Sequence, residues 1–181
     1  MKKCIFIITE DLDNGVIQSQ VLTHIKFLQK NKVSNFLLIV CFWDNMMVSY
    51  SKKKSAHYEK LFKIKIRFLK LIAPRVLFSN FINRRRLEKY FDQLNDKFDY
   101  IHARTDFCAV ISNSLKNKNK LQLIWDCRGY APAEIDYQEK SVFNLLKREL
   151  LKIRFRNACI ISDKVIVVSS YLESLVKKKN K

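Results

Sequence analysis

Short apolar runs that alternate with segments of helical periodicity limit the fold of this chain more than any other feature. No apolar run exceeds eight residues, and between the runs apolar side chains recur every three or four positions. Runs of this length suit strands that are buried on both faces. Strands and helices that alternate along a chain form right-handed βαβ units. We therefore predict an α/β fold, with a Rossmann-like parallel sheet of at least five strands and helices on both of its faces.

The positions of the expected elements follow from these patterns. Predicted strands cover residues 4–8, 36–43, 100–102, 121–125 and 165–168, and predicted helices cover residues 16–30, 58–72, 81–95, 107–115, 142–158 and 171–177. Residues 44–55 suit either a loop or a short edge strand. In the helix over 142–158, one set of residues is expected to face the core and a second set to face solvent. The first set is Val142, Leu146, Leu150 and Ile153, and the second is Lys147, Arg148, Lys152 and Arg156.

Length and cysteine usage favour one domain of a reduced, cytoplasmic protein. The chain has 181 residues, enough to bury a core, and we place the domain at residues 1–176 and a basic tail at residues 177–181. Its five cysteines are scattered and show no C-x-x-C spacing, and no histidine has the spacing of a metal ligand, so we expect no metal. The apolar stretch over residues 4–8 is too short for a signal peptide, and no run approaches the roughly 20 residues that cross a bilayer.

The positive charge of the chain is concentrated in one segment. Lys and Arg number 35 against 17 Asp and Glu, and residues 52–86 hold twelve cations and one anion. We interpret this segment as a basic amphipathic insertion, with a helix over 58–72 that ends at Pro74. Its basic stripe would comprise Lys60, Lys63, Arg67 and Lys70, and the next helix would carry Arg84, Arg85 and Arg86. Such a field implies an anionic partner: lipid headgroups, a nucleic acid or an anionic saccharide.

Polar residues follow three of the predicted strands where those strands end. His102 and Arg104 follow one strand, Asp126, Arg128 and Gly129 another, and Ser169 and Ser170 a third. Open α/β sheets bind ligands at the carboxyl ends of their strands, so we expect these residues along one edge. Asp126 and Arg128 are two positions apart, on one side of an extended chain, whereas Cys127 points to the other side.

Each candidate also has a structural interpretation. The Asp126–Arg128 pair either presents a guanidinium group to a phosphate or sugar hydroxyl, or is an ion pair that fixes its loop. Glu134 either orients Arg128 and binds acceptor hydroxyls, or is stabilised by a helix start. His102 is a candidate for acid–base chemistry or for a hydrogen bond to a loop carbonyl. Ser169 and Ser170 are candidates for substrate contact, and Ser170 also suits a helix N-cap. No residue is assigned a catalytic role.

Four stretches together resemble the N-terminal half of a family 4 glycosyltransferase, one lobe of the two-lobed GT-B architecture. They are GVIQSQVLTHIKFL at 15–28, YIHARTDFCAVISNSLK at 100–116, LIWDCRGYAPAE at 123–134 and SDKVIVVSSYLESL at 162–175. The resemblance implies transfer of a sugar from a nucleotide-sugar to an acceptor, with retention at the anomeric carbon. It also implies that this lobe binds the acceptor, and that the donor site and its paired glutamates lie in a C-terminal lobe absent from this chain. The chain alone is then expected to be inactive and to hold no cofactor.

The resemblance adds Asp11, Asn14 and Gly15 to the expected acceptor site, beside the strand-end residues and Glu134. Two departures limit the match: many family members have a glycine pair where this chain has only Gly15, and many have a histidine where this chain has Arg128. We expect a peripheral location at the inner face of a membrane, a lipid-linked or cell-surface polysaccharide acceptor, and possible pairing with a separate C-terminal lobe. The alternative is a non-enzymatic basic module that binds nucleic acid or anionic membrane, although no nucleic-acid-binding motif is present.

Overall fold

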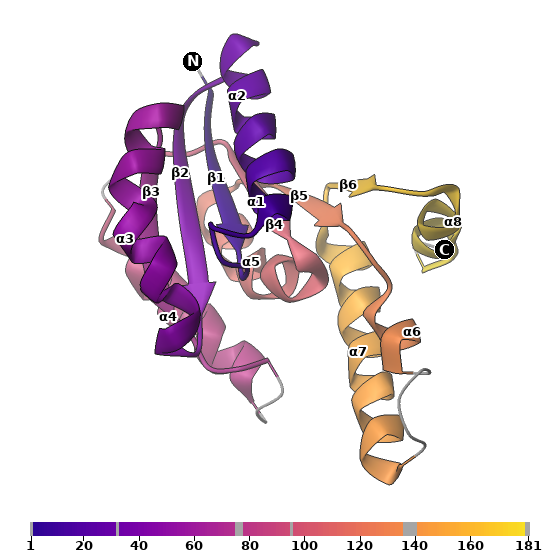
Figure 1. The fold of residues 1–181 in the computed structure, drawn as a ribbon. Helices are drawn as coiled ribbons and strands as arrows, with labels where there is room; N and C mark the ends of the chain where they lie inside the picture. The colour runs from indigo at the N-terminus through magenta and orange to yellow at the C-terminus, as the bar shows by residue number, and fades with distance from the viewer. Residues whose placement is uncertain (1, 32, 75–77, 95, 136–140, 180–181) are drawn as a thin grey trace.

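Six parallel strands form one sheet in the order β3-β2-β1-β4-β5-β6. The structure is a computed structural model that describes residues 2–31, 33–74, 78–94, 96–135 and 141–179 (Figure 1). The predicted Rossmann-like parallel sheet is therefore confirmed. Its strands are β1 (Lys2–Ile8), β2 (Val33–Phe42), β3 (Lys65–Lys70), β4 (Tyr100–Arg104), β5 (Gln122–Cys127) and β6 (Lys164–Val167).

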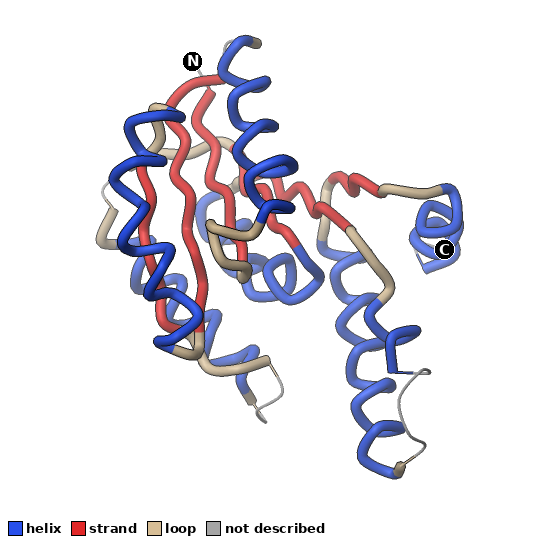
Figure 2. Tube along the Cα trace, in the orientation of Figure 1, coloured by secondary structure: helices blue, strands red, loops and turns tan. Residues whose placement is uncertain are grey.

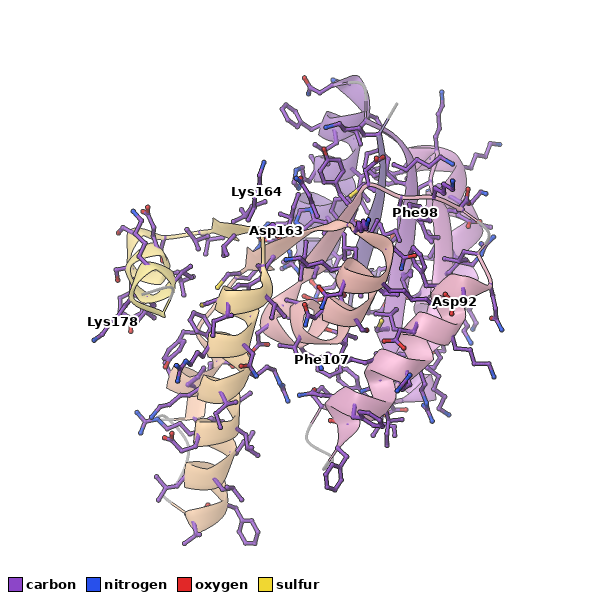
Figure 3. All side chains as sticks on the ribbon, turned by 180° about the vertical axis from the view of Figure 1, so that it is seen from behind. Asp92, Phe98, Phe107, Asp163, Lys164 and Lys178 are labelled. Atoms are coloured by element: carbon purple, nitrogen blue, oxygen red, sulfur yellow. The ribbon has the colours of Figure 1, made fainter. Side chains whose placement is uncertain are left out.

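Helices cover both faces of the sheet, as predicted. The α1, η1 and α2 segments form one continuous helical stretch, which lies with α3 on one face, whereas α4, α5 and α7 lie on the other (Figures 2 and 3). The helices are α1 (Gly15–Ile17), the π-helical turn η1 (Gln18–Leu22), α2 (Thr23–Lys30), α3 (Asn45–Phe62), α4 (Ser79–Asp92), α5 (Thr105–Asn119), α6 (Ala131–Ile135), α7 (Val142–Ile161) and α8 (Ser170–Lys179). Of the predicted basic tail, residues 180–181 lie outside the described residues and the rest ends α8.

The sheet separates two apolar cores. Alternate residues of β1 enter opposite cores: Ile5 and Ile7 belong to the core that includes residues of α4, α5 and α7, whereas Phe6 and Ile8 belong to the core that includes residues of the α1–α2 stretch. Burial on both faces explains why β1 is almost entirely apolar. Because apolar cores cover both faces of the sheet, charged groups are expected at the strand ends.

The predicted helix over residues 58–72 is wrong, and so is the loop or edge strand over 44–55. Helix α3 runs from Asn45 to Phe62, Lys63 takes a left-handed conformation with φ of 50°, and β3 then pairs with β2. Alternation explains the strand, because Ile64 and Ile66 are buried while Lys65 and Arg67 are exposed. The basic stripe of Lys60, Lys63, Arg67 and Lys70 is thus divided among a helix end, a turn and a strand. Arg84, Arg85 and Arg86 lie on α4, a helix as expected.

The predicted buried face of α7 is also wrong. Val142 and Leu146 are 81% and 60% exposed, and Leu150 and Ile153 are more than half exposed. Phe155, Ala158 and Cys159 are the buried residues, and the ring of Phe155 packs against Trp125 with centroids 5.2 Å apart. The N-terminal half of α7 extends past the sheet, so no strand lies under its apolar side chains (Figure 1).

No helix within the described ranges has both the length and the hydropathy that a bilayer-spanning segment needs.

The corrected burial of α7 predicts effects of very different size for two substitutions on one helix. Phe155→Ala should lower the free energy of unfolding by about 3–5 kcal/mol, because it opens a cavity against Trp125. Leu146→Ala should change that free energy by no more than about 0.5 kcal/mol, because its side chain is largely in solvent. Urea denaturation measures both. A comparable loss for Leu146→Ala would show that this side chain is packed within the folded chain.

Candidate functional site

The candidate site lies where the strand order reverses, between β1 and β4. Ligands of open α/β sheets bind in the crevice at such a point, beyond the carboxyl ends of the strands. Because all six strands are parallel, Asp11, Arg104, Arg128 and Ser169 lie along the same edge, as the sequence predicted. Glu10 follows β1 at this edge, and Asp126 lies beside Arg104 in the register of β4 and β5.

Arg104 connects three segments at this edge. Its Nε donates to Glu10 Oε1 at 2.7 Å, and one terminal nitrogen donates to Gln20 Oε1 at 3.0 Å. The other terminal nitrogen lies 3.6 Å from Asp126 Oδ2. Burial of the guanidinium group demands such partners, because an unpaired charge at this position would be costly. The contacts fix the plane of Arg104 and tie β1, η1 and β5 to β4.

Asp126 also pairs with Arg128, as its spacing predicted. Asp126 Oδ1 lies 2.7 Å from Arg128 Nε. The Asp126 side chain is 4% exposed, whereas that of Arg128 is 28% exposed. Cys127 lies between them and enters the opposite core, which confirms the expected alternation. Glu10, Arg104, Asp126 and Arg128 form a network, here called the strand-end network, whose two carboxylates balance its two guanidinium groups.

His102 lies beneath this network and is buried among aromatic rings. Its ring centroid is 4.4 Å from that of Phe6 and 5.3 Å from that of His24. Burial, and to a smaller extent the neighbouring His24, Arg128 and Arg104, together lower the pKa of His102 to about 3. The imidazole is therefore neutral at physiological pH, and its 4.0 Å approach to Asp126 is a contact of a neutral ring with a carboxylate. A buried neutral ring favours the structural interpretation of His102 over acid–base chemistry.

The loop after β1 uses its polar side chains to build the turn into α1. Asp11 accepts hydrogen bonds from the backbone N–H of Asp13 and from the hydroxyl of Ser51. Asn14 caps α1, since its Oδ1 accepts from the N–H of Val16 at 2.9 Å. Gly15 starts that helix. Asp11 and Asn14 thus have structural partners, and neither belongs to the strand-end network.

The remaining predicted residues lie at the same edge with different roles. Glu134 lies on α6, with Oε1 3.9 Å from where a Cβ on Gly129 would be. The carboxylate that pairs with Arg128 is Asp126 rather than Glu134. Ser169 Oγ accepts from the N–H of Leu172 at 3.3 Å and caps α8. The expected N-cap at Ser170 is wrong, because Ser170 is the first residue of that helix.

Three residues at this edge were not predicted from the sequence. Glu10 follows an apolar strand directly, so its position was a usable signal. Gln20 faces Arg104 from the π-helical turn η1, and such turns occur often at functional sites. Thr105 has a φ of 78°, a strained conformation for a β-branched residue, at the junction of Arg104 and α5. Neither the π turn nor this φ has a sequence signature.

Across the part of the chain that the structure describes, no three His, Cys, Asp or Glu side chains gather as a metal ion would require.

The comparisons with known proteins identify the fold. No protein-family model and no curated protein matches the sequence. Among solved structures, the chain is similar to a protein assigned as a UDP-N-acetylglucosamine 2-epimerase from Listeria monocytogenes (TM-score 0.64, 11% identity, covering 100% of this chain and 43% of that one). It is also similar to HepE from Anabaena in complex with UDP and glucose (TM-score 0.59, 12% identity, covering 99% of this chain and 41% of that one). A third similar structure is sucrose-phosphate synthase from Thermosynechococcus elongatus (TM-score 0.56, 11% identity, covering 98% of this chain and 45% of that one).

These similarities define the class of fold. The chain has the Rossmann-like α/β fold of one lobe of the GT-B architecture, as the resemblance implied. It spans less than half the length of each of these structures. Sequence identities of 11–12% describe a shared fold, whereas the activity has to be argued from this chain's own residues.

The burial of Asp126 predicts a large effect of removing its charge. Asp126→Asn leaves the guanidinium groups of Arg104 and Arg128 with one carboxylate between them, so the free energy of unfolding should fall by about 3–5 kcal/mol. Asp92→Asn is the matched control, because Asp92 pairs with Lys118 at an exposed position, and its effect should not exceed about 1 kcal/mol. Equal effects in urea denaturation would contradict the buried network.

The pKa of His102 predicts a dependence of stability on pH. His102 binds a proton near pH 6.5 in the unfolded chain and near pH 3 in the folded protein, so the free energy of unfolding should fall as pH drops through this interval. The slope from this residue should reach at most about 1.4 kcal/mol per pH unit. His102→Gln should flatten the curve measured by urea denaturation between pH 7 and pH 4. Burial also lowers the pKa of His24, so some slope should remain. An unchanged slope would place the imidazole in solvent.

Proposed function

We propose that this chain is the acceptor-binding lobe of a glycosyltransferase, which transfers a sugar from a nucleotide-sugar to a lipid-linked or cell-surface polysaccharide acceptor. The observation that carries the proposal is the strand-end network, at the edge where open α/β sheets bind ligands. The GT-B fold supports it, since the similar structures include one named as a UDP-N-acetylglucosamine 2-epimerase and one that holds UDP and glucose. The resemblance in four sequence stretches supports the choice of a retaining transferase.

The network can recognise an anionic acceptor through its most exposed cation. Arg104 is buried and held by Glu10 and Gln20, so it sets the geometry of the crevice. Arg128 is partly exposed and oriented by Asp126 through Nε, which prepares a planar guanidinium group for a phosphate or a sugar hydroxyl. In this proposal Arg128 contacts the acceptor and Asp126 positions Arg128. The donor nucleotide and the bond-making carboxylates belong to a second lobe, so no catalytic step is assigned to residues of this chain.

A location at the inner face of a membrane is part of the same proposal. The four cations of the predicted stripe are spread over the end of α3, the next turn and β3, and Arg84, Arg85 and Arg86 lie on α4. Some of these cations have intramolecular partners: Arg84 donates to Val110 O, Arg86 donates to Lys70 O and Arg85 pairs with Glu88. The net charge of +18 still favours an anionic surface. Nucleic acid is the alternative anionic partner, and the high positive charge of the chain is the observation that favours it.

A titration with glucose 1-phosphate tests the site, because this ligand joins a phosphate to a sugar. Arg128→Gln should weaken binding about tenfold or more, since it removes a charge-assisted hydrogen bond. Arg156→Gln is the control, because it removes the same charge from an exposed position on α7. Nuclear magnetic resonance shifts of residues near β4 and β5 measure both affinities. Equal weakening by the two variants would show that binding follows net charge and would contradict an acceptor site at Arg128.

A further inference from the structure

The N-terminal half of α7 carries an unpartnered apolar face. Val142, Leu146, Leu150 and Ile153 recur every three or four positions, so they share one side of the helix. All four are mostly exposed, and Phe143 beside them is 85% exposed. A patch of this kind exceeds the scattered apolar residues of an ordinary surface and marks an interaction site.

This face forms one wall of a groove. Trp43 after β2, Pro74 after β3 and Phe78 before α4 line the groove opposite Phe143 and Leu146, around a cavity of about 660 Å³. Phe78 has a left-handed backbone conformation and is largely exposed. None of the strand-end network lines the groove, so it is separate from the acceptor site. Figures 1 and 3 show that α4 and α7 both begin toward the edge at which β2 ends.

Cations, and among its described residues no carboxylates, line the groove itself, whereas Glu149 on α7 and Glu88 on α4 lie outside its lining and pair with Lys152 and Arg85. Lys147 and Arg154 line the groove, and no Asp or Glu is among its described lining residues. Arg154 has a structural role, because it donates to Pro74 O at 2.9 Å and lies over the ring of Phe107. On α4, Arg85 lies over the exposed ring of Phe81. Exposed Phe and Leu side chains beside Lys and Arg are typical of surfaces that lie in a bilayer interface.

We propose that the α7 groove, made of the apolar face of α7 and the wall at Trp43, Pro74 and Phe78, docks this protein on an anionic lipid bilayer. A second copy of the chain suits the groove poorly, because it would bring another net charge of +18 against a groove whose described lining residues include cations and no carboxylate. In this arrangement anionic headgroups balance the cations, while Phe143 and Leu146 insert among the acyl chains. The choice of bilayer rests on the proposed membrane location, but the docking surface differs from the basic stripe first predicted.

Sedimentation with vesicles that contain phosphatidylserine tests the groove. The variant Phe143→Glu with Leu146→Glu and the control Lys60→Gln with Lys63→Gln each lower the net charge by two. The first should weaken binding to these vesicles at least about tenfold, because it places carboxylates on the docking face. The control should retain binding within about twofold. Both should fold, since all four side chains are exposed.

Trp43 supplies a second readout, because it lines the groove while Trp125 is fully buried. Vesicles should shift the fluorescence of the wild-type protein to shorter wavelength, and the glutamate variant should show no shift. Equal losses in the two double variants, or no binding of the wild type, would overturn the proposal. Self-association without lipid that the glutamate variant abolishes would overturn it in favour of a second copy. Glucose 1-phosphate binding should be unchanged in the glutamate variant, so failure here is distinguishable from failure of the acceptor site.

Discussion

Burial of the parallel sheet on both faces is the constraint on which the rest of this structure depends. Helices cover β1, β4 and β5 closely enough that the middle of each strand admits almost only apolar side chains. Charged groups are therefore confined to the strand ends, where they can reach one another and the solvent. Arg104 is buried there only because Glu10, Gln20 and Asp126 surround it. The same burial makes His102 neutral, so the sheet determines both the position and the protonation of the site.

Much of the sheet and part of the site could be predicted from the sequence. Short apolar runs that end in polar residues indicated buried strands, as β1 and β5 show. Spacing also predicted that Asp126 and Arg128 would pair, because alternation along an extended chain is a local property. Gln20 and Thr105 could not be found in this way, since a π turn and a left-handed φ arise from how the chain packs. The helix predicted over 58–72 was wrong because the sequence Lys-Ile-Lys-Ile-Arg-Phe fits the two-residue period of a strand as well as the period of a helix.

The error on α7 has a different cause. The spacing of Val142, Leu146, Leu150 and Ile153 correctly indicated a helix with an apolar face. Periodicity shows that such a face needs a nonpolar environment, but it does not say whether that environment is the chain's own core. In this protein the sheet ends before the helix does, so the apolar face stays exposed, and we propose an external partner for it. An amphipathic helix that projects beyond its sheet is thus a signal for an interface, once the length of the sheet is known.

The charge balance of the strand-end network also limits how the site can attract an anion. Two carboxylates already neutralise its two guanidinium groups, so the buried charges offer an incoming phosphate little net attraction. The attraction has to come from the exposed part of Arg128 and from the surrounding field of the basic surface, which salt screens over about 8 Å. A buried network of zero net charge holds its shape without a ligand, which preorganises Arg128 at little cost in binding. In the proposed acceptor site, specificity would then depend on the fixed geometry of Arg104 and Asp126, whereas capture of the acceptor would depend on charges elsewhere on the chain.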